Sequence, residues 1–139
     1  MNAKPFDFVK RLFETLDDSG TKLALASSSN PDEVEYYTRL LRVGDLLEGS
    51  TSKGDAEHSK PSPEIFQAAL ERIGTDDAFT MTVGDTPYDI LASHRVALPI
   101  IAVLSGGFER ALLAKAEFLF DRVDDIVRKI EEVDAYFAR

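Results

Sequence analysis

The sequence contains no cysteine, and no stretch of it stays apolar long enough to cross a membrane as a helix. The first absence excludes disulfide bonds and thiol catalysis. The second, together with the lack of signal-peptide character in residues 1–5, makes a cytoplasmic protein the expectation. Basic residues are also few, because 16 lysines and arginines face 25 acids and leave a net charge of −9. Such a surface repels phosphate backbones, so we expect neither nucleic acid nor an anionic membrane as a partner.

The sequence has the composition of an ordinary globular domain, with 44% hydrophobic and 29% charged residues. We therefore treat residues 1–139 as a single domain with one core. Short continuous apolar runs alternate with segments whose apolar residues recur at helical spacing. This alternation predicts an α/β fold, with a three-layer, Rossmann-like parallel sheet that helices cover on both faces.

Capping residues, prolines, glycines and polar stretches set approximate bounds for these elements. Ser62 is expected to cap the third helix, and residues 52–59 are polar enough to form a loop. We expect strands at residues 22–26, 46–51, 79–83, 99–104 and 118–120, and helices at 5–18, 31–41, 63–73, 87–96, 109–115 and 123–137.

One strand end carries two acids beside a helix start. An apolar run stops at Gly84, Asp85 follows, and Thr86-Pro87 opens a helix in which Asp89 is the third residue. Two carboxylates in such a place suit Mg²⁺, which takes oxygen ligands. The same residues also fit a capping box, in which Thr86 caps the helix and Asp89 satisfies free amides. On these residues alone, the two interpretations are equally well supported.

Two other segments place polar groups where strands or loops meet helices. Ser27 and Ser28 precede the helix that starts at Pro31. They form either an anion-binding site at the helix N-terminus or a simple polar turn. Lys60 stands directly before Pro61 and is either a surface charge or an ammonium group over the same anion. Ligands of parallel sheets bind outside the carboxyl ends of the strands. We therefore expect these groups to converge with Asp85.

The order of a hydroxyl, a lysine and paired acids resembles the haloacid dehalogenase superfamily of phosphotransferases. The matching segments are 23–29, 60–66 and 84–89, and residues 101–108 are similar to the family's last core strand and turn. The resemblance runs from about residue 5 to the C-terminus. It implies a Mg²⁺-dependent phosphatase-type hydrolase that acts on a small phosphorylated metabolite. A phosphomutase is the alternative within the family.

The resemblance also implies roles for individual residues. The hydroxyl of Ser27 and the amide of Ser28 would bind the transferring phosphoryl group, and Lys60 would neutralise its developing charge. Asp85 would bind Mg²⁺ directly, and Asp89 would be either a ligand or a support for one.

The family's nucleophile, an aspartate in the pattern Asp-x-Asp-Gly-Thr at the end of the first strand, has no counterpart here. The nearest match, 17–21, follows an amphipathic helix and has Ser19 in place of the second acid, so we interpret it as a helix-ending turn. We therefore expect an N-terminally truncated chain that lacks the central first strand, between the strands leading to Ser27 and Asp85. Such a chain should be inactive or nearly so and should bind Mg²⁺ weakly.

Three responses to a missing central strand are possible. The two flanking strands could close up directly, the chain could be a fragment of a longer protein, or another chain could supply the strand. The last case corresponds to a different function, a non-catalytic phosphate-binding module completed by a partner chain or by a homodimer.

Overall fold

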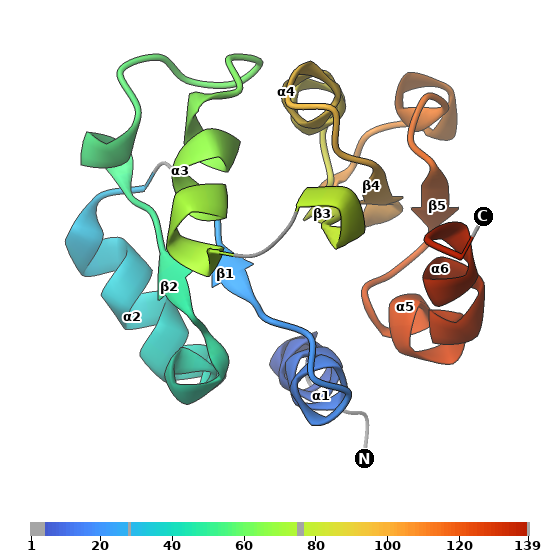
Figure 1. Ribbon diagram of the computed structural model, residues 1–139, viewed down its shortest axis with the longest axis horizontal. Coiled ribbons are helices and arrows are strands. Elements are labelled where there is room, and N and C mark those ends of the chain that lie inside the picture. The colour runs from blue at the N-terminus through green and yellow to red at the C-terminus, as the bar shows by residue number, and fades with distance from the viewer. Residues whose placement is uncertain (1–4, 28, 75–76, 139) are drawn as a thin grey trace.

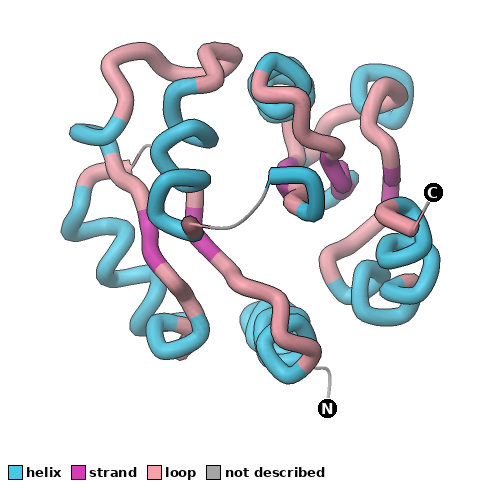
Figure 2. Tube along the Cα trace, in the orientation of Figure 1, coloured by secondary structure: helices cyan, strands magenta, loops and turns pink. Residues whose placement is uncertain are grey.

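The computed structural model describes residues 5–27, 29–74 and 77–138 (Figure 1). Parallel strands alternate with helices along the chain, as Figure 2 shows by colour, and this arrangement confirms the predicted α/β fold. The strands are β1 (Ala24–Leu25), β2 (Gly49–Ser50), β3 (Thr82–Gly84), β4 (Ile100–Val103) and β5 (Phe118–Phe120). The helices are α1 (Pro5–Asp18), α2 (Pro31–Leu41), α3 (Glu64–Ile73), α4 (Pro87–Arg95), α5 (Asp124–Arg128) and α6 (Ile130–Tyr136).

The strands form two separate parallel sheets. β1 pairs with β2, with Ala24 opposite Gly49. β4 lies between β3 and β5, with Val83 opposite Ile101 and Ala102 opposite Leu119. Among the described strands no pairing joins β1 to β3. The two strands expected to flank a central position therefore do not close up directly.

Strand β4 carries the core of the three-stranded sheet. Its odd-numbered residues Ile101 and Val103 pack with residues of α1, α5 and α6. Its even-numbered residues Ile100 and Ala102 pack with Ile90 of α4 on the opposite face. Successive side chains of a strand point to opposite faces, so this alternation places one helical layer on each side of the sheet. All four β4 residues are buried, at 4% exposure or less.

A mostly apolar cleft of about 450 Å³ lies between the two sheets. It is lined by residues of both β1 and β3 and by residues of α1 and α3. Val83, at the middle of β3, lines this cleft and is 49% exposed. An apolar side chain in mid-strand is normally covered by neighbouring strands and helices, so the cleft leaves part of the core surface open.

Several elements differ from their predicted bounds. The strand expected at 79–83 starts only at Thr82, because Asp77–Phe79 form a 3₁₀ turn in which Phe79 is 71% exposed. The helix expected at 109–115 is a short 3₁₀ turn, η5 (Arg110–Leu113). The expected helix at 123–137 is divided into α5 and α6, because the backbone of Lys129 leaves helical geometry.

The start of α3 also differs from expectation. Its N-cap is Pro63, which has no side chain that can accept a hydrogen bond. Ser62 belongs to the preceding turn, where its amide donates to the carbonyl of Ser59. Its hydroxyl accepts a hydrogen bond of 3.4 Å from the amide of Glu64, the first residue of α3. Ser62 therefore bonds the first amide of the helix from one residue before the N-cap position.

The nearest sequence match to the family's nucleophile motif is a helix end, as predicted. α1 ends at Asp18, and Gly20 adopts a φ of +85° in the turn that follows.

Within the described residues, no helix combines the length and the apolar character that crossing a membrane requires.

Candidate active site

The helix start at Thr86 is a complete capping box. The Thr86 hydroxyl accepts a hydrogen bond from the Asp89 amide at 3.1 Å. In return, Asp89 Oδ2 accepts from the amides of Asp85 and Thr86, both at 3.1 Å, and from the Thr86 hydroxyl at 3.0 Å. The capping interpretation of the sequence is therefore confirmed for Asp89, and one oxygen of its carboxylate is fully used.

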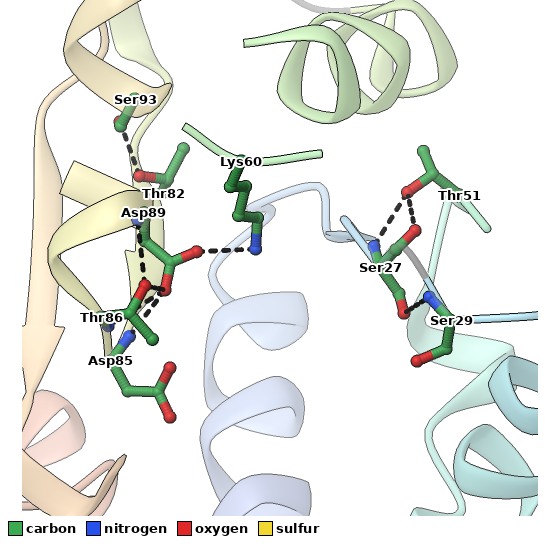
Figure 3. A network of polar contacts seen from close by, with 9 residues as sticks. All are labelled: Ser27, Ser29, Thr51, Lys60, Thr82, Asp85, Thr86, Asp89 and Ser93. Atoms are coloured by element: carbon green, nitrogen blue, oxygen red, sulfur yellow. Dashed lines mark hydrogen bonds and ion pairs between the residues drawn. The ribbon is translucent and has the colours of Figure 1, made fainter. Parts of the chain in front are cut away.

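The second oxygen of Asp89 is paired with Lys60. The distance from Lys60 Nζ to Asp89 Oδ1 is 2.6 Å, and the two side chains are 28% and 6% exposed. Lys60 precedes α3, whose residues contact β1 and β2, whereas Asp89 belongs to α4 beside β3 and β4. The ion pair therefore connects the parts of the chain that carry the two sheets, and Lys60 also lines the cleft between them (Figure 3).

The environment of Asp89 keeps it ionised. Burial by itself would raise the pKa of the Asp89 carboxyl, because low polarity disfavours the charged form. The hydrogen bond and charge of Lys60, together with the Asp85 amide and the Thr86 hydroxyl, outweigh this effect. The net result is a pKa below the ordinary value of 3.8. Asp89 thus holds the Lys60 ammonium group with a permanent negative charge.

Asp85 has the opposite character. Its side chain is half-buried, and no hydrogen bond or ion pair to its carboxylate is found within the described residues. Gly84, just before it, allows Asp89 to approach, because a Cβ atom on Gly84 would lie 2.6 Å from Asp89 Cβ. The resemblance implied that Asp85 binds Mg²⁺ directly and that Asp89 is either a ligand or a support. Here the Asp89 carboxylate is bonded through both oxygens, whereas that of Asp85 has no polar partner among the described residues.

Ser27 is held at the end of β1 by Thr51. The Ser27 amide donates to Thr51 Oγ1 at 2.8 Å, and that hydroxyl donates to the Ser27 carbonyl at 2.9 Å. The Ser27 hydroxyl accepts from the Ser29 amide at 3.1 Å, which leaves its own proton available for another acceptor. Ser28, the second predicted phosphate-binding residue, lies outside the described residues.

The predicted site residues converge only in part. Lys60 and Asp89 are in contact, and Asp85 adjoins Asp89 through its amide. In Figure 3, Lys60 lies between this strand end and Ser27. Within the described part of the chain, no hydrogen bond or ion pair links Ser27 to Lys60. Lys60 therefore has a polar contact with the strand end that carries Asp85 and Asp89, and none with Ser27 among the described residues.

Two residues that hold the site residues in place could not be identified from the sequence. Thr51 is 1% exposed and is an isolated threonine in a polar stretch. Arg95, at the end of α4, donates to the carbonyl of Pro61 at 2.8 Å and so holds the backbone next to Lys60. Only tertiary contacts reveal their roles, because both act on residues more than 20 positions away.

The residues offer Mg²⁺ an incomplete set of ligands. No group of three or more histidines or acids that could hold a metal is found in the described ranges. One open carboxylate, Asp85, remains, and Mg²⁺ commonly uses one or two carboxylates together with waters and substrate phosphates. Asp85 therefore offers one oxygen donor of the kind that Mg²⁺ takes.

Comparison with known protein families matches residues 1–103 to the family described as haloacid dehalogenase-like hydrolase. The chain belongs to this family. Pyrophosphatase PpaX of Bacillus mycoides is 24% identical to it over 134 residues, which are 95% of this chain and 62% of that protein.

Solved structures of other proteins show the same fold. β-Phosphoglucomutase from Clostridium difficile matches with a TM-score of 0.81 at 19% identity, over 94% of this chain and 57% of that one. CbbY from Rhodobacter sphaeroides, solved in complex with xylulose-(1,5)-bisphosphate, matches with a TM-score of 0.73 at 22% identity, over 84% and 53%. The haloacid dehalogenase-like chain described here thus spans less than two thirds of the length of all three relatives.

Proposed function

We propose that this chain supplies the lysine, phosphate-binding and metal-binding portion of a Mg²⁺-dependent phosphoryl-transfer site. The observation that carries the proposal is the 2.6 Å ion pair between Lys60 and the buried Asp89, next to the open carboxylate of Asp85. A buried carboxylate that fixes an ammonium group beside a free carboxylate is costly to assemble. A phosphoryl-transfer site needs both charges, the ammonium group to stabilise the phosphoryl oxygens and the carboxylate to bind the metal.

Each residue has a distinct task in this proposal. Lys60, held in place by Asp89, stabilises the charge that spreads over the phosphoryl oxygens in the transition state. Ser27 donates its free hydroxyl proton to one of those oxygens, and Ser28 is proposed to contribute its amide. Asp85 is the Mg²⁺ ligand, and Asp89 supports the site without binding the metal. When bound, Mg²⁺ supplies Lewis-acid stabilisation of the phosphate oxygens.

The substrate class follows from the same chemistry. A lysine and a hydroxyl directed at one anion, with a metal beside them, suit a small phosphate monoester. The names of the relatives, a pyrophosphatase and a phosphoglucomutase, and the bisphosphate bound by CbbY support this class. Phosphatase-type hydrolysis is the leading reaction, and transfer within a phosphosugar, as in a phosphomutase, is the alternative.

The chain by itself is expected to turn over phosphate esters poorly or not at all. The site needs an aspartate nucleophile, and the 17–21 segment that most resembles its motif lies at the end of α1. We propose that the nucleophile comes from a strand placed between β1 and β3. An in-frame coding sequence upstream of Met1 that ends a strand in Asp-x-Asp-Gly-Thr would support this source.

An activity and metal-binding assay tests the proposal. The chain is titrated with Mg²⁺, and phosphate release from an aryl phosphate is followed. Weak Mg²⁺ binding that is lost in Asp85→Asn but kept in Asp45→Asn, an exposed acid in Gly44–Leu46, is the expected result. Robust turnover that Asp85→Asn abolishes would contradict the expected inactivity. Mg²⁺ binding that Asp85→Asn leaves unchanged would remove Asp85 from the site.

A second candidate function is a module whose sheet is completed by another chain. The separation of β1 from β3 and the cleft of about 450 Å³ between them favour it. Each of these strands has a sheet neighbour on one side, and a buried backbone group without a partner costs roughly 1–3 kcal/mol. A strand from a partner or from a second copy of this chain would satisfy both free edges.

The oligomeric state distinguishes the two candidates. Light scattering coupled to size exclusion is run on the chain and on Val83→Lys, which places a charge at the cleft. Leu112→Lys, at a position that is 56% exposed, is the control. A dimer that Val83→Lys dissociates and Leu112→Lys does not supports the completed module. A monomer at all concentrations excludes completion by a second copy.

A further inference from the structure

The turn that follows β4 lies directly against the carboxylate of Asp85. This turn, Ser105-Gly106-Gly107, comes at the end of η4 (Leu104–Gly106). A Cβ atom on Gly106 would lie 2.5 Å from Asp85 Oδ2 and 2.7 Å from both Asp85 Cβ and Cγ. These separations are far below any van der Waals contact between such atoms, so only glycine leaves room for the Asp85 side chain as it stands.

The turn is anchored on both sides and cannot easily move away. Val103 before it is 4% exposed, and Leu104 and Phe108 pack against the buried cluster around Ile100 and Leu113. The Gly107 amide donates to the Leu104 carbonyl at 3.1 Å, and Gly107 adopts a φ of +89°. The two glycines therefore differ in purpose. Gly107 permits the turn of the backbone, and Gly106 permits the close approach of Asp85.

Asp85 has little else to determine where its carboxylate lies. Asp89 is held by three hydrogen bonds on one oxygen and by Lys60 on the other. Within the described residues the Asp85 carboxylate has no such bonds, which keeps its lone pairs available to a cation but leaves its rotamer unrestrained by polar partners. Gly106 lies close enough to this side chain to limit where the carboxylate can be placed.

We propose that Gly106 is a positioning residue for Asp85, so that the turn after β4 sets where the open carboxylate lies at the strand ends. The metal-binding consequence of this proposal rests on the proposed function of Asp85 as a Mg²⁺ ligand. The steric consequence does not depend on it. A side chain at position 106 requires either the Asp85 carboxylate or the turn to shift. Because Leu104 and Phe108 hold the turn on both sides, we expect the carboxylate to be the part that moves.

A double-mutant cycle tests the steric step without any metal. Urea denaturation midpoints are compared for the wild type, Gly106→Ala, Asp85→Gly and the double variant. Asp85→Gly removes all three atoms that a Cβ at position 106 would meet. Gly106→Ala is expected to lower the midpoint strongly in the wild type and only slightly in the Asp85→Gly background. Additive changes would overturn the proposal.

Gly54→Ala is the matched control. Gly54 also lies in a 3₁₀ turn, η2 (Lys53–Asp55), it does not have a positive φ, and a Cβ there would meet nothing within 4 Å. Its midpoint should stay the same or rise slightly, because alanine restricts the unfolded chain. If Gly106→Ala alone does not fold while the double variant does, the same coupling is demonstrated.

Mg²⁺ titration tests the functional step separately. Gly106→Ala is expected to weaken Mg²⁺ binding by about tenfold or more, as displacing the support of a metal ligand does. Gly54→Ala should leave the affinity unchanged. Equal affinity in Gly106→Ala and wild type would overturn the positioning role. A wild-type chain that binds no Mg²⁺ would refute the metal role of Asp85, and the urea cycle would still decide the role of Gly106.

Discussion

The two sheets of this domain differ in how completely they are built. β4 has a strand on each side and a helical layer on each face, and its residues are at most 4% exposed. β1 has a paired strand on one side, and its residues Ala24 and Leu25 are only half-buried. The comparison shows that a strand of a parallel sheet becomes core only when both of its neighbours are present.

The same difference separates the two parts of the site. Asp85, Thr86 and Asp89 follow β3 of the more complete sheet and are connected by hydrogen bonds of 3.0–3.1 Å. Ser27 follows β1 of the smaller sheet, and among the described residues its long-range side-chain hydrogen bonds are those with Thr51. Lys60 reaches from the smaller sheet to the larger one. The geometry of the site therefore depends on how firmly the two sheets hold each other.

The largest expected effect compares equivalent truncations in the two sheets. Ile100→Ala should lower the free energy of unfolding by about 3–4 kcal/mol, because the side chain is fully buried in β4. Leu25→Ala should cost only about 1–2 kcal/mol, because β1 is half-buried. Chemical denaturation measures both. Equal losses would contradict the comparison and indicate that the cleft beside β1 is filled in solution.

The next effect tests the connection between the sheets. Lys60→Met leaves the Asp89 carboxylate buried without its cation, and should cost roughly 3 kcal/mol, the lower end for a broken buried ion pair, because Lys60 is itself 28% exposed. Lys53→Met, at an exposed lysine, is the control and should change the stability by about 0.5 kcal/mol or less. Equal urea midpoints for the two variants would show that the ion pair contributes nothing to holding the sheets together.

The smallest effect is a dependence of stability on acid pH. The pKa of Asp89 is lowered on folding, so the folded state binds fewer protons than the unfolded state as the pH falls. The stabilisation is complete well above the ordinary pKa of 3.8 and is lost as the pH falls through the lowered pKa. Urea midpoints measured down this range should fall less steeply in Lys60→Met than in the wild type. Identical slopes would mean that Asp89 does not respond to Lys60.

The sequence predicted well those helices whose start is marked by a capping residue followed by proline. The helix starts at Pro31 and Pro87 were correct, because Asn30 and Thr86 accept hydrogen bonds from amides in the first turn. Periodicity failed near the C-terminus, where it indicated one helix and the structure has two that meet at Lys129. The apolar pattern there is set by packing on β4, and both helices satisfy it.

The candidate site was predictable in its residue types and less so in their connections. The spacing of Asp85 and Asp89 is compatible with both a metal site and a cap. The choice for Asp89 depended on Lys60, which lies 29 positions earlier in the chain. The close approach of Gly106 to Asp85 could not be predicted for the same reason, because a glycine in a turn gives no sign of which side chain lies against it.

The split between β1 and β3 also has a consequence for how the domain moves. Because strand pairing does not join the described sheets, we expect the β1–β2 unit with α2 and α3 to open at a lower free energy than the sheet of β3, β4 and β5. Amides of Leu25 and Thr51 would then exchange with solvent through partial opening, whereas those of Ile101 and Ala102 would require global unfolding. Any strand that filled the cleft would merge the two blocks into one.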